Sequence, residues 1–129
     1  MFHLKKKYII IVVGVLLLVA LDQVTKLIIV NNLALHENIV IIQDFFTITS
    51  RRNDGAAWSI LSGNMMIFYF ITALAFVLFF YLSKDVDFKN KKIYSISFIL
   101  LIAGTIGNFI DRLLFQEVID FLDFYILLQ

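Results

Sequence analysis

The chain has 129 residues, of which 61% are hydrophobic and 16% charged, and its formal net charge is only +1. A soluble domain of this length has too little interior to bury so much apolar surface, so a lipid bilayer is the expected solvent. A nearly neutral chain is also unsuited to holding a nucleic acid by phosphate neutralisation. Cysteine is absent, which excludes disulfides, thiolate metal sites and a cysteine nucleophile.

Three apolar runs predict transmembrane helices, at about residues 8–30, 65–82 and 93–109. The first run is interrupted by "DQVTK" at residues 22–26. The part before it is shorter than the ~20 residues that a span needs, so we expect the helix to continue through Val30. A cleaved signal peptide is the alternative for this segment. No small-x-small cleavage pattern follows Ala20, and two further spans favour a retained anchor.

Lysines are concentrated on one side of the expected spans. "KKK" at residues 5–7 precedes the first span, and the linker "SKDVDFKNKK" at residues 83–92 separates the other two. By the positive-inside rule both lie in the cytoplasm. Residues 31–63 and the tail 110–129 are then extracytoplasmic.

The outer segment 31–63 is too long for a simple turn. It contains "IVIIQDFFTITS", which is rich in β-branched and aromatic residues, and "NDG" at residues 53–55 is a turn signal. We therefore expect an all-α polytopic membrane protein, organised as a single membrane domain over residues 1–129, with a small extracytoplasmic β-element. A helix in the outer segment is the weaker alternative.

Several polar residues lie near the ends of the expected spans, and most have a simple structural interpretation. Asp22 and Lys26 are four residues apart and can pair on one helix face, if only as an ion pair at the membrane edge. Asn53 could be a turn former, and Arg112 could extend towards lipid headgroups. Asn108 is less easily explained, because an amide near the end of a span costs free energy unless a helix or a ligand satisfies it.

The carboxylates of the C-terminal stretch favour acid–base chemistry. On one continuous helix Asp111 and Asp120 would point to nearly opposite faces, whereas Asp120 and Asp123 would share a face. His3 and His36 are far apart, so a His/Cys metal site is not expected. The remaining hypothesis is a pair of carboxylates, one protonated and one ionised, that activates a water and protonates a leaving amine.

Four stretches resemble successive motifs of lipoprotein signal peptidase, also called signal peptidase II. They are "DQVTK" (22–26), "RNDGAAWSIL" (52–61), "GTIGNFIDR" (104–112) and "EVIDF" (117–121). They occur in the family's order and span nearly the whole chain. The resemblance implies a bacterial inner-membrane aspartic endopeptidase with four transmembrane helices and an outer β-cradle. Such enzymes cut the signal peptide from diacylglyceryl-modified prolipoproteins, immediately before the lipidated cysteine, and need no metal or other cofactor.

The resemblance also implies roles for individual residues, taken motif by motif. Asp120 corresponds to the first catalytic aspartate. The polar residues that line the substrate site correspond to Asn53, Asn108 and Arg112. The residues that shape or support the site correspond to Asp22, Lys26 and Asp111. The implied partners are the prolipoprotein substrate and membrane lipids.

The chain departs from the family pattern after Phe121. An "N-x-A-D" motif that opens the fourth helix, and supplies the second catalytic aspartate, does not occur in residues 1–129, and residues 121–129 are too short to span a bilayer. We expect a truncated chain in which Asp120 is half of a dyad and the other half belongs to a missing C-terminal segment. Two alternatives are a non-catalytic protein that binds lipoprotein signal peptides, and a small transporter or channel subunit whose outer aspartates collect cations.

Overall fold

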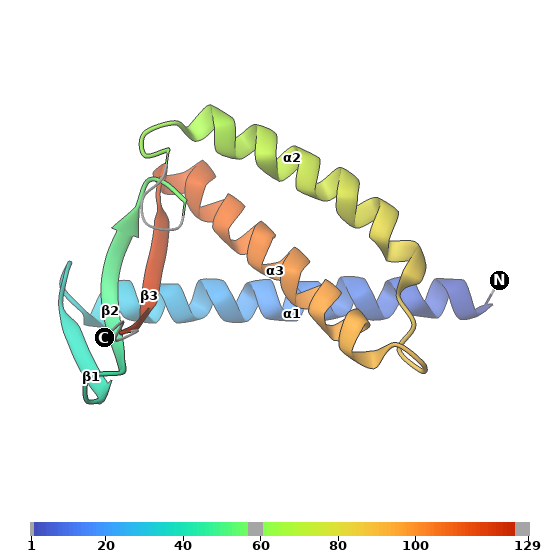
Figure 1. Cartoon of the computed structure of the whole chain (residues 1–129), viewed down its shortest axis with the longest axis horizontal. Helices are drawn as coiled ribbons and strands as arrows, with labels where there is room; N and C mark the ends of the chain where they lie inside the picture. Colours follow the sequence, from blue (N-terminus) through green and yellow to red (C-terminus); the bar gives the residue numbers. More distant parts are fainter. Residues whose placement is uncertain (1, 57–60, 126–129) are drawn as a thin grey trace. The chain divides into compact units, whose positions relative to one another are not determined.

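The structure is a computed structural model that describes residues 2–56 and 61–125. Its elements (Figure 1) are, in chain order, α1 (Phe2–Asn32), β1 (Asn38–Ile42), β2 (Phe46–Asn53), α2 (Met65–Leu82), the short 3₁₀ helix η2 (Ser83–Asp85), α3 (Lys92–Phe115) and β3 (Val118–Phe124). In the described part, three helical segments are long and apolar enough to cross a membrane: Lys5–Asn32, Met65–Asp85 and Lys92–Phe115. The expected class, a mostly helical membrane protein with a small β-element, is confirmed.

The chain divides into two compact units, which are described separately. The helical unit comprises Met1–Asp22 and Met66–Ile110, and the sheet unit comprises Gln23–Met65 and Asp111–Gln129. That the chain acts as a single membrane domain remains a prediction.

The helical unit has a small core and a large apolar exterior. Its core is formed by side chains of α1, α3 and the segment after η2: Ile11, Val15, Val86, Phe98, Ile99 and Ala103. Gly14 permits close packing there, because a Cβ at this position would lie 3.2 Å from Cδ1 of Ile99. Large apolar side chains on the outer faces are exposed, for example Phe80 at 85% and Ile93 at 83%. This is the pattern of helices whose outer faces are solvated by lipid rather than water.

The sheet unit is built on a three-stranded antiparallel sheet in the order β1-β2-β3. A tight turn with Asp44 at a φ of 57° joins β1 to β2. The other edge of β2 pairs with β3, which comes from the C-terminal tail, and Phe46 stacks on Phe124 with ring centroids 4.6 Å apart. The central strand β2 is therefore held by segments on both sides of it in the sequence.

The C-terminal stretch differs from the sequence-based expectation. Helix α3 does not end near residue 109 but continues to Phe115, where Gln116 adopts a φ of 58° and ends the helix. The chain then forms β3, not a continued helix. Asp120 and Asp123 would share a face only on a continuous helix, and this stretch is a strand, so that condition is not met.

Candidate active site

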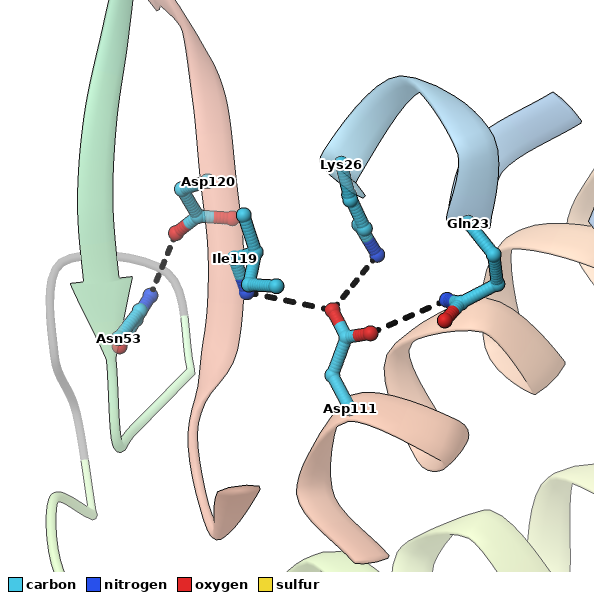
Figure 2. A network of polar contacts seen from close by, with 6 residues as sticks. All are labelled: Gln23, Lys26, Asn53, Asp111, Ile119 and Asp120. Carbon is cyan, nitrogen blue, oxygen red and sulfur yellow. Dashed lines mark hydrogen bonds and ion pairs between the residues drawn. The ribbon is translucent and has the colours of Figure 1, made fainter. Parts of the chain in front are cut away.

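A buried carboxylate organises the sheet unit. Asp111, near the end of α3, is 0% exposed and forms an ion pair with Lys26 of α1, with 2.7 Å between Oδ2 and Nζ. Its Oδ1 accepts a hydrogen bond from Nε2 of Gln23 at 3.0 Å, and its Oδ2 accepts one from the main-chain N–H of Ile119 at 3.2 Å. Figure 2 shows these contacts converging on one side chain from α1 and β3. Asp111 thus joins two helices to a strand.

These contacts explain how a charge can be buried at this position. A buried ion is tolerated when an opposite charge and hydrogen-bond donors replace the lost water, and Asp111 has both. Lys26 is itself only 3% exposed. Since the N–H of Ile119 immediately precedes Asp120, the same carboxylate also fixes the main chain beside the candidate catalytic residue.

Asp120 lies on β3, paired across the sheet with Arg51 of β2. Its Oδ2 accepts a hydrogen bond from Nδ2 of Asn53 at 3.1 Å (Figure 2), and the side chain is partly exposed. The two residues are 67 positions apart in sequence. The pairing of β2 with β3 is what brings this carboxylate and this amide together.

Asn53 also shapes the turn that follows β2. Its Oδ1 accepts a hydrogen bond from the N–H of Gly55 at 2.9 Å, and its Nδ2 donates to the main-chain oxygen of Ala56 at 3.0 Å. The turn-forming interpretation of Asn53 is therefore correct, and the same side chain contacts Asp120 as well.

Arg112 reaches the same turn from α3. Its Nη2 donates to the main-chain oxygen of Gly55 at 3.3 Å. Asn53 and Arg112, far apart in sequence, therefore both bond to Gly55, which is buried. The structure brings Asp120, Asn53 and Arg112 to one turn and the strand beside it.

Two ion pairs tie β2 to the segment around β3. Arg51 pairs with Asp123 at 3.0 Å, and Arg52 pairs with Glu117 at 3.3 Å. Asp123, which a helical C-terminal stretch would place on the face of Asp120, is thus engaged with Arg51. Both pairs are partly exposed, and they reinforce the strand pairing that positions Asp120.

Asp22 and Asn108 belong to the helical unit. The side chain of Asp22 lies against Gly107 of α3, so closely that a Cβ on Gly107 would overlap its carboxylate. Asn108 is partly buried on α3. The ion pair that the structure gives Lys26 is with Asp111; its expected pairing with Asp22 stays a prediction.

One member of the site escaped sequence reasoning. No motif or spacing argument points to Gln23, although a polar amide inside a membrane-length helix is itself a signal of function or of a buried partner. Within residues 2–56 and 61–125, no group of three or more His, Cys, Asp or Glu side chains is placed to hold a metal ion.

The fold and this cluster define a multi-pass helical membrane protein that carries a carboxylate–amide site on a small sheet. The family model described as signal peptidase (SPase) II matches residues 14–129. The chain belongs to the signal peptidase II family, the lipoprotein signal peptidases. This makes it a member of a family of membrane-bound proteases.

Curated relatives carry the same family name. A lipoprotein signal peptidase of Listeria monocytogenes serotype 4a is 48% identical over 106 residues, which cover 82% of this chain and 68% of that protein. One of Staphylococcus carnosus is 45% identical over 105 residues, covering 80% of this chain and 64% of that protein. The chain thus spans about two thirds of the length of these relatives.

Solved structures agree in fold. One bacterial membrane enzyme superposes with a TM-score of 0.78 at 41% identity, covering 90% of this chain and 70% of the solved one. A second gives a TM-score of 0.73 at 40% identity, covering 90% and 74%. The similarity in sequence and in fold therefore extends over most of the chain.

Proposed function

We propose that Asp120 is a catalytic carboxylate of an aspartic-type endopeptidase that removes signal peptides from diacylglyceryl-modified prolipoproteins, immediately before the lipidated cysteine. The observation that carries the proposal is the hydrogen bond from Asn53 to Asp120, 3.1 Å long, across two paired strands. Buried Asp111 supports it by bonding the main chain one residue before Asp120. A carboxylate whose side chain and neighbouring main chain are both fixed by hydrogen bonds is suited to general acid–base catalysis.

The chemistry asks two things of the site. A base must take a proton from the attacking water, and an acid must protonate the departing amine nitrogen. Two carboxylates that share one proton can do both. Asp120 supplies one of them, and Asn53 orients it by donating to Oδ2. The resemblance assigns the other to an "N-x-A-D" motif, which residues 1–129 do not contain.

Substrate binding falls to residues around the same turn. Asn53 and Arg112 both contact Gly55, and we assign to them, together with Asn108, the polar main chain of the signal peptide near the cleavage point. Amide and guanidinium groups suit this role because they donate to peptide carbonyls without being consumed in the reaction. Lys26 and Asp111 hold the site's framework, and Asp22 is assigned to the same supporting role.

The proposed location is the bacterial inner membrane, with the site on the extracytoplasmic side. The lysines before α1 and between α2 and α3 favour a cytoplasmic position for those segments. Helix α1 then leads outward to β1, and α3 leads outward to β3. An outer site suits a peptidase whose substrates are exported.

The test compares two substitutions of the same chemical kind in the gene's full reading frame. Asp120→Asn should lower cleavage of a diacylglyceryl-modified prolipoprotein in vesicles by roughly 10²-fold or more, because an amide cannot exchange the proton. Asp44→Asn is the control, since Asp44 is exposed in the β1–β2 turn and Asn tolerates its positive φ. Cleavage by the Asp120→Asn protein at the control's rate would refute the assignment.

Residues 1–129 on their own should not process prolipoproteins, because they hold only one of the two carboxylates that the resemblance implies. Supplying the "N-x-A-D" segment as a second polypeptide should bring activity that depends on Asp120. Turnover by residues 1–129 alone that Asp123→Asn abolishes would contradict this and indicate a dyad within β3. The ion pair of Asp123 with Arg51 opposes that outcome, since it engages the carboxylate that such a dyad would need.

A further inference from the structure

The helical unit contains a second polar feature, far along the chain from Asp120. It is an open groove of about 660 Å³ between the start of α1 and the segment that links α2 to α3. Five lysines line it, and they come from separate parts of the chain: Lys6, Lys7, Lys84, Lys89 and Lys91. None of the motifs that resemble the peptidase family includes these residues. We call it the lysine groove.

One wall of the lysine groove is fixed by Lys7. Its Nζ donates to the main-chain oxygens of Ser83 at 3.0 Å and Lys84 at 3.1 Å. The start of α1 is therefore bonded to η2, directly after α2. This brings Lys6 and Lys84 to the same groove. Lys84 lies with its Nζ 3.6 Å from the ring centroid of Tyr81.

Another part of the lining is a turn held by Asp87. Its carboxylate accepts hydrogen bonds from the N–H groups of Lys89 at 2.8 Å and Asn90 at 3.1 Å, and from Nδ2 of Asn90 at 2.8 Å. The N–H of Lys91 donates to the main-chain oxygen of Asp87, and the hydroxyl of Ser95, which is 0% exposed, accepts from the N–H of Asp87. Lys89 and Lys91 thus stand on a defined turn.

The charge of the lysine groove is positive. Its lining includes five lysines and two aspartates, Asp85 and Asp87, so the net charge of the lining is +3. The carboxylate of Asp87 is turned to the main chain of its own turn. The start of α3 lies just beyond Lys91, so the positive end of a helix dipole adds to the field.

The remaining lining of the lysine groove is apolar, and the neighbouring helix surfaces are apolar too. Ile10, Val86 and Phe88 complete the lining. Ile9 of α1 is 61% exposed and Ile93 of α3 is 83% exposed, and they follow the groove residues in the membrane-length segments. The ligand that matches this arrangement carries an anionic head and apolar chains.

We propose that the lysine groove binds the phosphodiester headgroup of an anionic phospholipid, with its acyl chains on the exposed apolar side chains of α1 and α3. Basic pockets between transmembrane helices bind such headgroups when several lysines converge at the membrane surface. The lysine groove is more than a general excess of lysine in this part of the chain. Lys5 is next to Lys6 in the sequence and Lys92 is next to Lys91, yet neither Lys5 nor Lys92 lines the groove.

The experiment uses the purified chain in phosphatidylcholine micelles and measures thermal unfolding while dioleoyl phosphatidylglycerol is added. Wild type should be stabilised in a saturable way. In Lys6→Gln/Lys91→Gln the half-saturating lipid concentration should rise roughly tenfold or more. Lys5→Gln/Lys92→Gln is the matched control, with the same loss of charge outside the groove, and should behave like wild type. The single variant Lys89→Gln gives a second, milder measurement should the double variant fold poorly.

The outcomes are distinct. Equal weakening by the two double variants would show attraction by net charge only and overturn the site. No weakening by Lys6→Gln/Lys91→Gln, or by Lys89→Gln where the double variant does not fold, would overturn it too. Inorganic phosphate at the same concentration should not stabilise the protein; stabilisation equal to that by phosphatidylglycerol would overturn the lipid as the ligand. None of these variants touches Asp120.

Discussion

Asp111 is the residue whose loss should be felt most in the sheet unit. Asp111→Asn removes the carboxylate that lies 2.7 Å from the ammonium of Lys26, a side chain that is only 3% exposed. Removing one partner of a buried ion pair costs about 3–5 kcal/mol, so the free energy of unfolding should fall by about that amount. Asp123→Asn is the control: its pair with Arg51 is partly exposed and should cost about 1 kcal/mol or less. Equal losses in denaturant unfolding would contradict the central role of Asp111.

Two glycines of α3 give a matched pair of substitutions. Gly107→Ala should destabilise by about 1–3 kcal/mol, because the new methyl overlaps the carboxylate of Asp22. Gly104→Ala meets nothing within 4 Å and should be neutral or stabilising by up to about 1 kcal/mol, as alanine favours the helix. Thermal unfolding of both variants measures the difference, and an equally tolerated Gly107→Ala would contradict the contact.

At single positions, the sequence indicates site residues that lie within motifs. It does not indicate contacts between residues that are far apart in the chain. The motifs point to Asp120, Asn53 and Arg112 as site residues, and the structure brings these three to one turn and the strand beside it. The ion pair of Lys26 with Asp111 could not be found from spacing, because the two lie on different helices. Spacing along a single helix can suggest only a nearby partner for Lys26, which is Asp22.

At the scale of elements, the turn held by Asp87 is sensitive to acid. The hydrogen bond from the Asn90 side chain, followed by those from the N–H groups of Asn90 and Lys89, lowers the pKa of Asp87 below its usual value of 3.8. A lowered folded-state pKa means that the stabilisation is present above the unfolded pKa and is lost as pH falls through the folded value. Unfolding measured from pH 6 down to about pH 2 should show this loss in wild type. Asp87→Asn should lack this acid-dependent loss of stability. The same dependence of unfolding on pH in both proteins would contradict the role given to Asp87.

The helices were predictable from the sequence and the third strand was not. Apolar length alone defined α1, α2 and α3, since a bilayer imposes that length. Strand β3 is a strand because β2, a distant part of the chain, pairs with it and sets Arg51 opposite Asp120, which no local pattern reveals. The continuation of α3 to Phe115 includes Asp111, whose partner Lys26 lies on another helix and is likewise not revealed by a local pattern.

For the whole molecule, the orientation in the membrane can be tested directly because the chain has no cysteine. Single substitutions Asp44→Cys and Lys89→Cys place a thiol in the β1–β2 turn and in the lysine groove, both exposed. A membrane-impermeant maleimide should label Asp44→Cys in intact cells and Lys89→Cys only after permeabilisation. The reverse pattern would contradict the proposed outer position of the site.

Asp120 is the residue that we propose to act chemically on a bound prolipoprotein. The most direct measurement is single-turnover cleavage of a diacylglyceryl-modified prolipoprotein by the protein of the full reading frame, with binding of the same substrate measured alongside. Asp120→Asn should bind the substrate as tightly as Asp44→Asn does, while cleaving it roughly 10²-fold or more slowly. If Asp120→Asn cleaves at the rate of Asp44→Asn, or loses cleavage only by losing binding, Asp120 is not the catalytic carboxylate.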